Sequence, residues 1–171
     1  MKPKICLVCD IPNWAYEMIA QKLKKDLDYK YEIRIDYYDM RAKPDELYEF
    51  LEKNDDCDLI HFFWRKSLIQ VETESFKEKV EASGRNVEDY IKEKSKKIST
   101  SVYDFLFTDD ESINIYKNIF NLYSSNYYVS TKKLYEIYLK IEQYKNPETV
   151  IHDTCDWELF LPQKLERFND T

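Results

Sequence analysis

The chain has 171 residues, of which 43% are hydrophobic and 35% charged, and its formal net charge at pH 7 is −7. This length and composition predict a globular protein of one domain or a little more and exclude a disordered chain. The acidic balance excludes the basic surface that nucleic-acid binding needs, and no apolar run is long enough to cross a membrane.

Two further features bear on location and on phosphate binding. The N-terminus passes into a strand pattern without a signal-peptide pattern, which predicts a cytoplasmic protein with free thiols. The chain has fifteen tyrosines and one glycine, Gly84. Because P-loops and dinucleotide fingerprints depend on glycines, neither exists in this sequence.

Strand and helix patterns alternate along the chain. Continuous or alternating apolar residues predict strands at residues 4–9, 31–38, 58–64, 98–107, 126–130 and 149–153. Apolar residues three or four apart predict helices at residues 14–27, from 44 onward with Leu47, Phe50 and Leu51 inward, twice within 66–97 on either side of Ser83 and Gly84, and at 112–123 and 132–144. We read Ser130 as the N-cap of the last helix.

This alternation predicts an α/β fold, a doubly wound and mostly parallel Rossmann-like sheet with helices on both faces and right-handed crossovers. We expect one such domain over residues 1–150, with a charged helical insertion at about 66–97 whose charges form a solvated face, a lid or a partner-docking element. Ligands of such sheets bind beyond the carboxyl ends of the strands, where the strand order reverses. The residues to examine can therefore be chosen by position.

Polar and aromatic residues gather at those strand ends. Taken singly, Asp10, Asn13 and Ser130 are ordinary capping residues, Trp14 packs in a core, and His61 is a hydrogen-bonded core histidine. Taken together they form a mixture suited to carbohydrate, because a sugar ring stacks on indole while Asn, Asp and Arg bond its hydroxyls. Our substrate-binding candidates are Asp10, Asn13, Trp14, His61, Arg65, Asp104 and Ser130, and we assign no catalytic base.

Two short motifs favour structural roles. Cys6 and Cys9 have redox-pair spacing but lie in a strand, where positions i and i+3 face opposite sides, so we expect buried thiols. The segment DDCD at 55–58 imitates a metal-binding Asp-x-Asp motif, yet it precedes the third strand at the amino edge, where capping and turn formation explain it better. With two histidines in the chain and no paired ligands, we expect no metal site.

The tail "TVIHDTCDWELFLPQ" resembles a passage of the GT-B glycosyltransferases, the retaining family that includes sucrose and capsule transferases. That passage, V-I-x-N-G-V-D-x-x-x-F-x-P, leads from the N-terminal to the C-terminal domain. Asp156, Phe160 and Pro162 keep its frame, while Asp153 and Thr154 replace its Asn and Gly. Upstream, "DLIHFFW", "NYYVSTKKLYE" and "STSVYDFLF" are similar to three other passages of the family, with Tyr103 in place of a histidine that many relatives use near the donor sugar.

The resemblance implies the acceptor-side half of a glycosyltransferase, with residues 151–171 as last strand and start of a linker to a C-terminal donor-binding domain. It implies metal-independent transfer of a sugar from a nucleotide-sugar, a co-substrate rather than a cofactor, to a glycan or other hydroxyl acceptor. This half alone is expected to be inactive. Membrane association is possible for such relatives, but no basic face supports it. The alternatives are a receiver-like signalling module and a non-catalytic interaction subunit.

Overall fold

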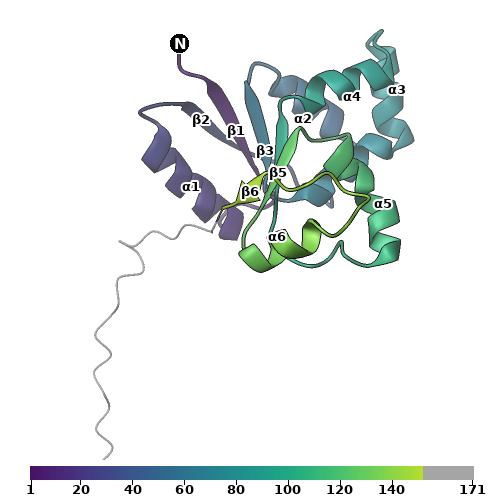
Figure 1. Cartoon of the computed structure of the whole chain (residues 1–171). Coiled ribbons are helices and arrows are strands. Elements are labelled where there is room, and N and C mark those ends of the chain that lie inside the picture. The colour runs from purple at the N-terminus through teal and green to yellow at the C-terminus, as the bar shows by residue number, and fades with distance from the viewer. Residues whose placement is uncertain (152–171) are drawn as a thin grey trace, which may run out of the picture.

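Six parallel strands form one open sheet in the computed structural model, which describes residues 1–151 (Figure 1). The strands are β1 (Lys4–Cys9), β2 (Glu32–Tyr37), β3 (Leu59–Phe62), β4 (Ile98–Val102), β5 (Asn126–Val129) and β6 (Thr149–Val150). The helices are α1 (Ala15–Leu27), α2 (Leu47–Lys53), the 3₁₀ helix η1 (Arg65–Glu72), α3 (Glu74–Ala82), α4 (Val87–Ser95), α5 (Asp110–Asn121) and α6 (Lys132–Tyr138). The strands lie in the order β2-β1-β3-β4-β5-β6.

The strand order reverses between β1 and β3. From β1 the chain moves outward to β2, returns to the other side of β1 as β3, and continues in that direction to β6. This is the flavodoxin-type order of a doubly wound sheet with one strand added, so the predicted fold class is confirmed. Val8 lies beside Phe62, and the loops that follow β1 and β3 therefore leave the same edge of the sheet at the reversal.

The helices divide unequally between the two faces of the sheet (Figure 1). Alternate side chains of β1, β3 and β4, such as Val8, Ile60 and Ile98, pack with α2, η1, α3, α4 and α5 on one face, and α5 and α6 continue that layer over β5. Leu7 and Cys9 point to the opposite face, where Ala20 of α1 covers them. Within residues 1–151, α1 is the one helix on this face.

Part of the tyrosine content fills a cluster of aromatic rings, in tilted and edge-on contact with Phe120, between the sheet and helices α5 and α6. Phe120 has ring centroids of Tyr127, Tyr138 and Tyr144 at 4.7, 5.9 and 4.5 Å. The hydroxyls reach backbone carbonyls at the edge of this layer: Tyr127 donates to Lys145 at 2.6 Å and Tyr144 donates to Phe107 at 2.9 Å. A tyrosine here fills space as phenylalanine does and also satisfies a carbonyl.

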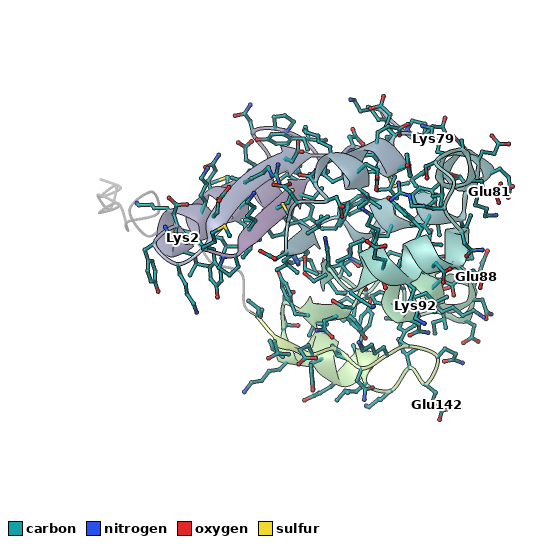
Figure 2. All side chains as sticks on the ribbon, turned by 90° about the horizontal axis from the view of Figure 1, so that it is seen from above. Lys2, Lys79, Glu81, Glu88, Lys92 and Glu142 are labelled. Atoms are coloured by element: carbon teal, nitrogen blue, oxygen red, sulfur yellow. The ribbon has the colours of Figure 1, made fainter. Side chains whose placement is uncertain are left out.

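The charged region forms the crossover from β3 to β4. Helices α3 and α4 lie on either side of Gly84, whose φ of 78° suits glycine, so the predicted helical pair is confirmed. Glu81, Glu88 and Lys92 point away from the sheet (Figure 2), whereas Lys79 pairs with Glu49 of α2 at 2.7 Å.

One lysine of the same crossover points inward. Lys94 of α4 is 2% exposed and its Nζ lies 2.8 Å from oxygens of both Glu52 and Asp55. Burial by itself raises the pKa of Glu52, but hydrogen bonds from Arg85 and Lys94 outweigh it and lower that pKa to about 2. This ion network fastens α4 to α2.

The acidic segment before β3 lies at the amino edge of the sheet, as predicted. Asp55 pairs with Lys94 and Lys97, and Asp56 pairs with Lys4 and Arg34. Asp58 accepts the backbone N–H of Lys4 at 2.8 Å. Residues 54–56 form the predicted turn, and Asp55 and Asp56 make ion pairs rather than helix caps.

The two cysteines of β1 lie in different cores. Cys6 packs in the layer that contains α2, and Cys9 packs beneath α1. Burial raises the pKa of each thiol to about 12, so both are protonated and poor nucleophiles at neutral pH. The prediction of buried thiols on opposite faces is confirmed for this pair.

Two expected features of the last helix need correction. Thr131, not Ser130, caps α6, because the Thr131 hydroxyl accepts the Leu134 N–H at 3.2 Å while Ser130 is buried at the end of β5. The helix ends at Tyr138, six residues earlier than its apolar spacing suggested. The last described strand is Thr149–Val150, at the start of the segment 149–153 predicted as a strand. The tail motif, including Asp153 to Asp156, lies outside the described residues.

Among residues 1–151, no helix has the length and apolarity to cross a membrane.

Candidate functional site

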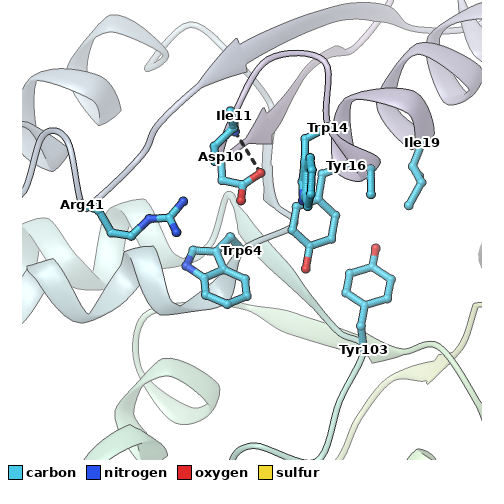
Figure 3. Close-up of a pocket in the computed structure, with 9 residues that line it drawn as sticks. Asp10, Ile11, Trp14, Tyr16, Ile19, Arg41, Trp64 and Tyr103 are labelled. Atoms are coloured by element: carbon cyan, nitrogen blue, oxygen red, sulfur yellow. Dashed lines mark hydrogen bonds between the residues drawn. The ribbon is translucent and has the colours of Figure 1, made fainter.

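A hollow of about 460 Å³ lies at the carboxyl edge of the sheet, beside the strand reversal (Figure 3). The loops after β1, β2 and β3 and the residue after β4 contribute to it, together with the first turns of α1. It is lined by Asp10, Ile11, Trp14, Ala15, Tyr16, Ile19, Arg41, Trp64 and Tyr103. The position matches the ligand site expected for a doubly wound sheet.

The loop after β1 is held by its own polar groups. Asp10 Oδ1 accepts the Ile11 N–H at 2.9 Å, and Asn13 adopts φ 58°, a left-handed conformation that Asn tolerates better than most residues. The Asn13 N–H donates to Glu17 Oε2 at 2.5 Å, and this bond, with a hydrogen bond from Tyr37, lowers the pKa of Glu17. The N-cap residue of α1 is Trp14, whose side chain makes no capping hydrogen bond. Glu17 instead accepts a backbone N–H just before the helix, that of Asn13.

Trp14 is 61% exposed, which excludes the core-packing interpretation. Its indole stands at the rim of the hollow, and Trp64, which follows β3, forms another wall (Figure 3). Tyr16 stacks on Phe63 with centroids 5.6 Å apart, and its ring lies 5.4 Å from that of Tyr103. The hollow thus has four aromatic side chains on rigid supports.

Arg41 supplies the cation of the hollow. Asp39 Oδ1 accepts both the backbone N–H of Arg41 at 2.9 Å and its Nε at 3.1 Å. These bonds, led by the backbone one, lower the pKa of Asp39 and fix the loop after β2. The guanidinium is directed toward Asp10 and Trp64 (Figure 3).

His61 lies within the sheet rather than in the hollow. It is 6% exposed, its Nδ1 lies 2.8 Å from Ser99 Oγ, and its ring stacks on Tyr128 at 5.3 Å. Burial lowers its pKa to about 4. The geometry is that of a hydrogen-bonded core histidine.

We expect His61 to make stability depend on pH. Its folded pKa of about 4 is below the ordinary 6.5, so the unfolded chain binds the proton first. The contribution is complete above pH 6.5 and is lost as pH falls from 6.5 to 4, by about 3 kcal/mol over that window. An NMR titration should place the His61 midpoint near 4, and urea unfolding of His61→Asn should lack this component. A midpoint above 6 would contradict the assignment.

Arg65 and Asp104 pair with each other outside the hollow. Arg65 is 1% exposed, and its Nη2 donates to Asp104 Oδ1 at 2.6 Å. The guanidinium carbon lies 3.9 Å from the ring centre of Phe107. The pair joins the segments that follow β3 and β4 and packs on Phe107, which gives it a structural position.

The structure therefore brings two of the seven predicted residues, Asp10 and Trp14, into the hollow. Asn13 shapes the adjoining loop, while His61, Arg65, Asp104 and Ser130 lie elsewhere. Arg41 and Trp64, which also line the hollow, belong to the strand-end residues from which the candidates were chosen, although neither was among the seven. Tyr16 and Ile19 carried no signal, because their helical spacing is that of an ordinary core face.

Within residues 1–151, no three histidine, cysteine or acidic side chains gather closely enough to hold a metal ion. Comparison of the chain with protein-family models, curated proteins and solved structures finds no match. The functional argument therefore depends on the hollow itself and on the sequence resemblance.

Proposed function

We propose that this chain is the acceptor-side domain of a GT-B type glycosyltransferase and that the hollow binds a sugar ring of the acceptor. The observation that supports this most is the pairing of two indoles, Trp14 and Trp64, with the polar groups of Asp10 and Arg41 at the strand reversal. Apolar ring faces of a sugar pack on indole, and its hydroxyls need donors and acceptors at the rim.

The residues divide the work of binding between them. Trp14 and Trp64 supply stacking surface, and Asp10 accepts hydrogen bonds from hydroxyls, while Arg41 donates them. The fixed loops after β1 and β2 hold these groups in place before the ligand arrives, which reduces the entropy lost on binding.

The transfer step belongs to the complete two-domain enzyme in this proposal. A nucleotide-sugar donor would sit on a C-terminal domain, and the acceptor hydroxyl would be oriented toward it from the hollow. Closure of the cleft would exclude water so that transfer is favoured over hydrolysis. No residue of this chain is assigned as catalytic base.

Trp14→Ala and Trp64→Ala should each weaken sugar binding by about tenfold, the equivalent of about 1.4 kcal/mol, because each removes one stacking face. The measurement is an NMR titration of the chain with methyl glucoside, methyl galactoside and methyl mannoside. Phe105→Ala is the matched control, since Phe105 is an exposed aromatic at the same edge that does not line the hollow.

Absence of saturable binding by every glycoside would overturn the proposal. The receiver-like alternative has its own measurement, titration with Mg²⁺ and beryllofluoride. Saturable shifts near Asp10 in that titration, without shifts from the glycosides, would favour the signalling module.

A further inference from the structure

The charges around the hollow are not balanced. Asp10 Oδ1 accepts the Ile11 N–H, whereas Oδ2 accepts no hydrogen bond from residues 1–151, and the carboxylate faces the hollow (Figure 3). Arg41, the cation across from it, pairs with Asp39 at 3.1 Å. Within the described chain, no cation lies within ion-pair distance of Asp10.

The other charged groups near the hollow do not neutralise the charge of Asp10. Glu17, one turn into α1, adds a second carboxylate beside the loop after β1. Lys66 Nζ lies 6.0 Å from the Trp64 ring centre but closer to the rings of Phe107 and Tyr116, at 5.5 and 5.7 Å, on the α5 side. Among residues 1–151, the negative charge of Asp10 at the hollow is therefore uncompensated.

The walls of the hollow also favour a cation. The faces of aromatic rings carry negative electrostatic potential, and Trp is the strongest of them in attracting ammonium groups. The indoles of Trp14 and Trp64 line the hollow that Asp10 borders, whereas Tyr16 packs on Phe63 and Tyr103. Two indoles beside one carboxylate form an arrangement suited to an ammonium group.

We infer that the hollow selects an acceptor sugar that carries a protonated amine, with the ammonium on the Asp10 side and the ring against Trp14. This inference rests on the proposed sugar site and specifies its ligand. Arg41 disfavours a cation at its own end of the hollow, which orients the amine toward Asp10. An acidic sugar would use Arg41 instead and would face the repulsion of Asp10.

The test compares dissociation constants of four methyl glycosides by NMR titration at pH 6.5: the glucosaminide, whose amine is protonated, the N-acetylglucosaminide, the glucoside and the glucuronide. The glucosaminide should bind about tenfold more tightly than the glucoside, and about 0.5 M NaCl should reduce this preference. Asp10→Asn should abolish the preference, so that the glucosaminide and the glucoside bind the variant with equal affinity, because the amide carries no charge. Asp110→Asn, at an exposed site on α5, should change neither value.

Equal binding of glucosaminide and glucoside would overturn the charge preference while the sugar site stands. Tighter binding of the glucuronide or the N-acetyl sugar would overturn it as well, as would a preference that survives in Asp10→Asn. If none of the four glycosides binds, the proposed function itself fails.

Discussion

Asp104→Ala is expected to lower the free energy of unfolding by about 3 kcal/mol, because it leaves the buried Arg65 guanidinium without its carboxylate. Arg65 is 1% exposed and already has one unsatisfied donor: its Nε is buried without a hydrogen-bond partner in the described chain. Asp104 is itself 33% exposed, so the loss should fall at the lower end of the range for buried pairs. Urea unfolding followed by circular dichroism measures it.

The double variant Arg65→Met with Asp104→Ala separates an uncompensated charge from lost packing. Methionine keeps much of the side-chain volume against Phe107 and buries no charge, so stability should return to within about 1 kcal/mol of the parent. Asp104→Asn should be intermediate, since the amide oxygen can still accept from Arg65 and from the Leu106 N–H. A double variant as unstable as Asp104→Ala would contradict the explanation.

The fold could be predicted because its determinants are local and repeated. Apolar runs bounded by turn residues define β1 and β3, and the spacing of Leu47, Phe50 and Leu51 defines the buried face of α2. Each strand is followed by a helix, and this alternation leaves few topologies open. The N-cap of α6 was harder to predict, because Ser130 and Thr131 are adjacent and either hydroxyl could have served. In the structure Thr131 accepts the Leu134 N–H.

The site was harder to predict, because the side chain of a residue near a strand end can lie either within the protein core or in the hollow. His61 and Trp64 are three residues apart in one segment, yet the first bonds Ser99 within the sheet and the second borders the hollow. Arg65 follows Trp64 directly but is buried, paired with Asp104 and packed on the Phe107 ring. These outcomes depend on partners about 40 residues away, which no local pattern contains.

The difference between local patterns and distant partners also explains the buried lysine of the crossover from β3 to β4. Lys94 lies in a run of charged residues that are mostly exposed, and nothing in its residue type sets it apart from them. Its side chain nevertheless reaches Glu52 and Asp55. Helical period identifies an inward position, whereas the identity of its partner comes from the packing of α4 on α2. A buried lysine in such a run is therefore found from structure.

Phe120→Ala is expected to lower the free energy of unfolding by about 4 kcal/mol, because Phe120 is the shared neighbour of the rings that fill the layer between the sheet and helices α5 and α6. It is 1% exposed, and a cavity at its position would remove packing from Tyr127, Tyr138 and Tyr144 together. These tyrosines cannot move in to fill the gap without giving up hydrogen bonds such as the one from Tyr144 to the Phe107 carbonyl. Urea unfolding gives the value.

Two variants make this prediction specific to the ring cluster. Phe120→Leu, which keeps most of the volume, should cost less, about 1.5 kcal/mol. Leu122→Ala, two residues further along and 55% exposed, should cost less than about 0.5 kcal/mol, so the contrast cannot come from the end of α5 as such. A loss below about 1.5 kcal/mol for Phe120→Ala would mean that the rings repack freely, and the tyrosine hydroxyl bonds would then not be what fixes this half of the sheet to its helices.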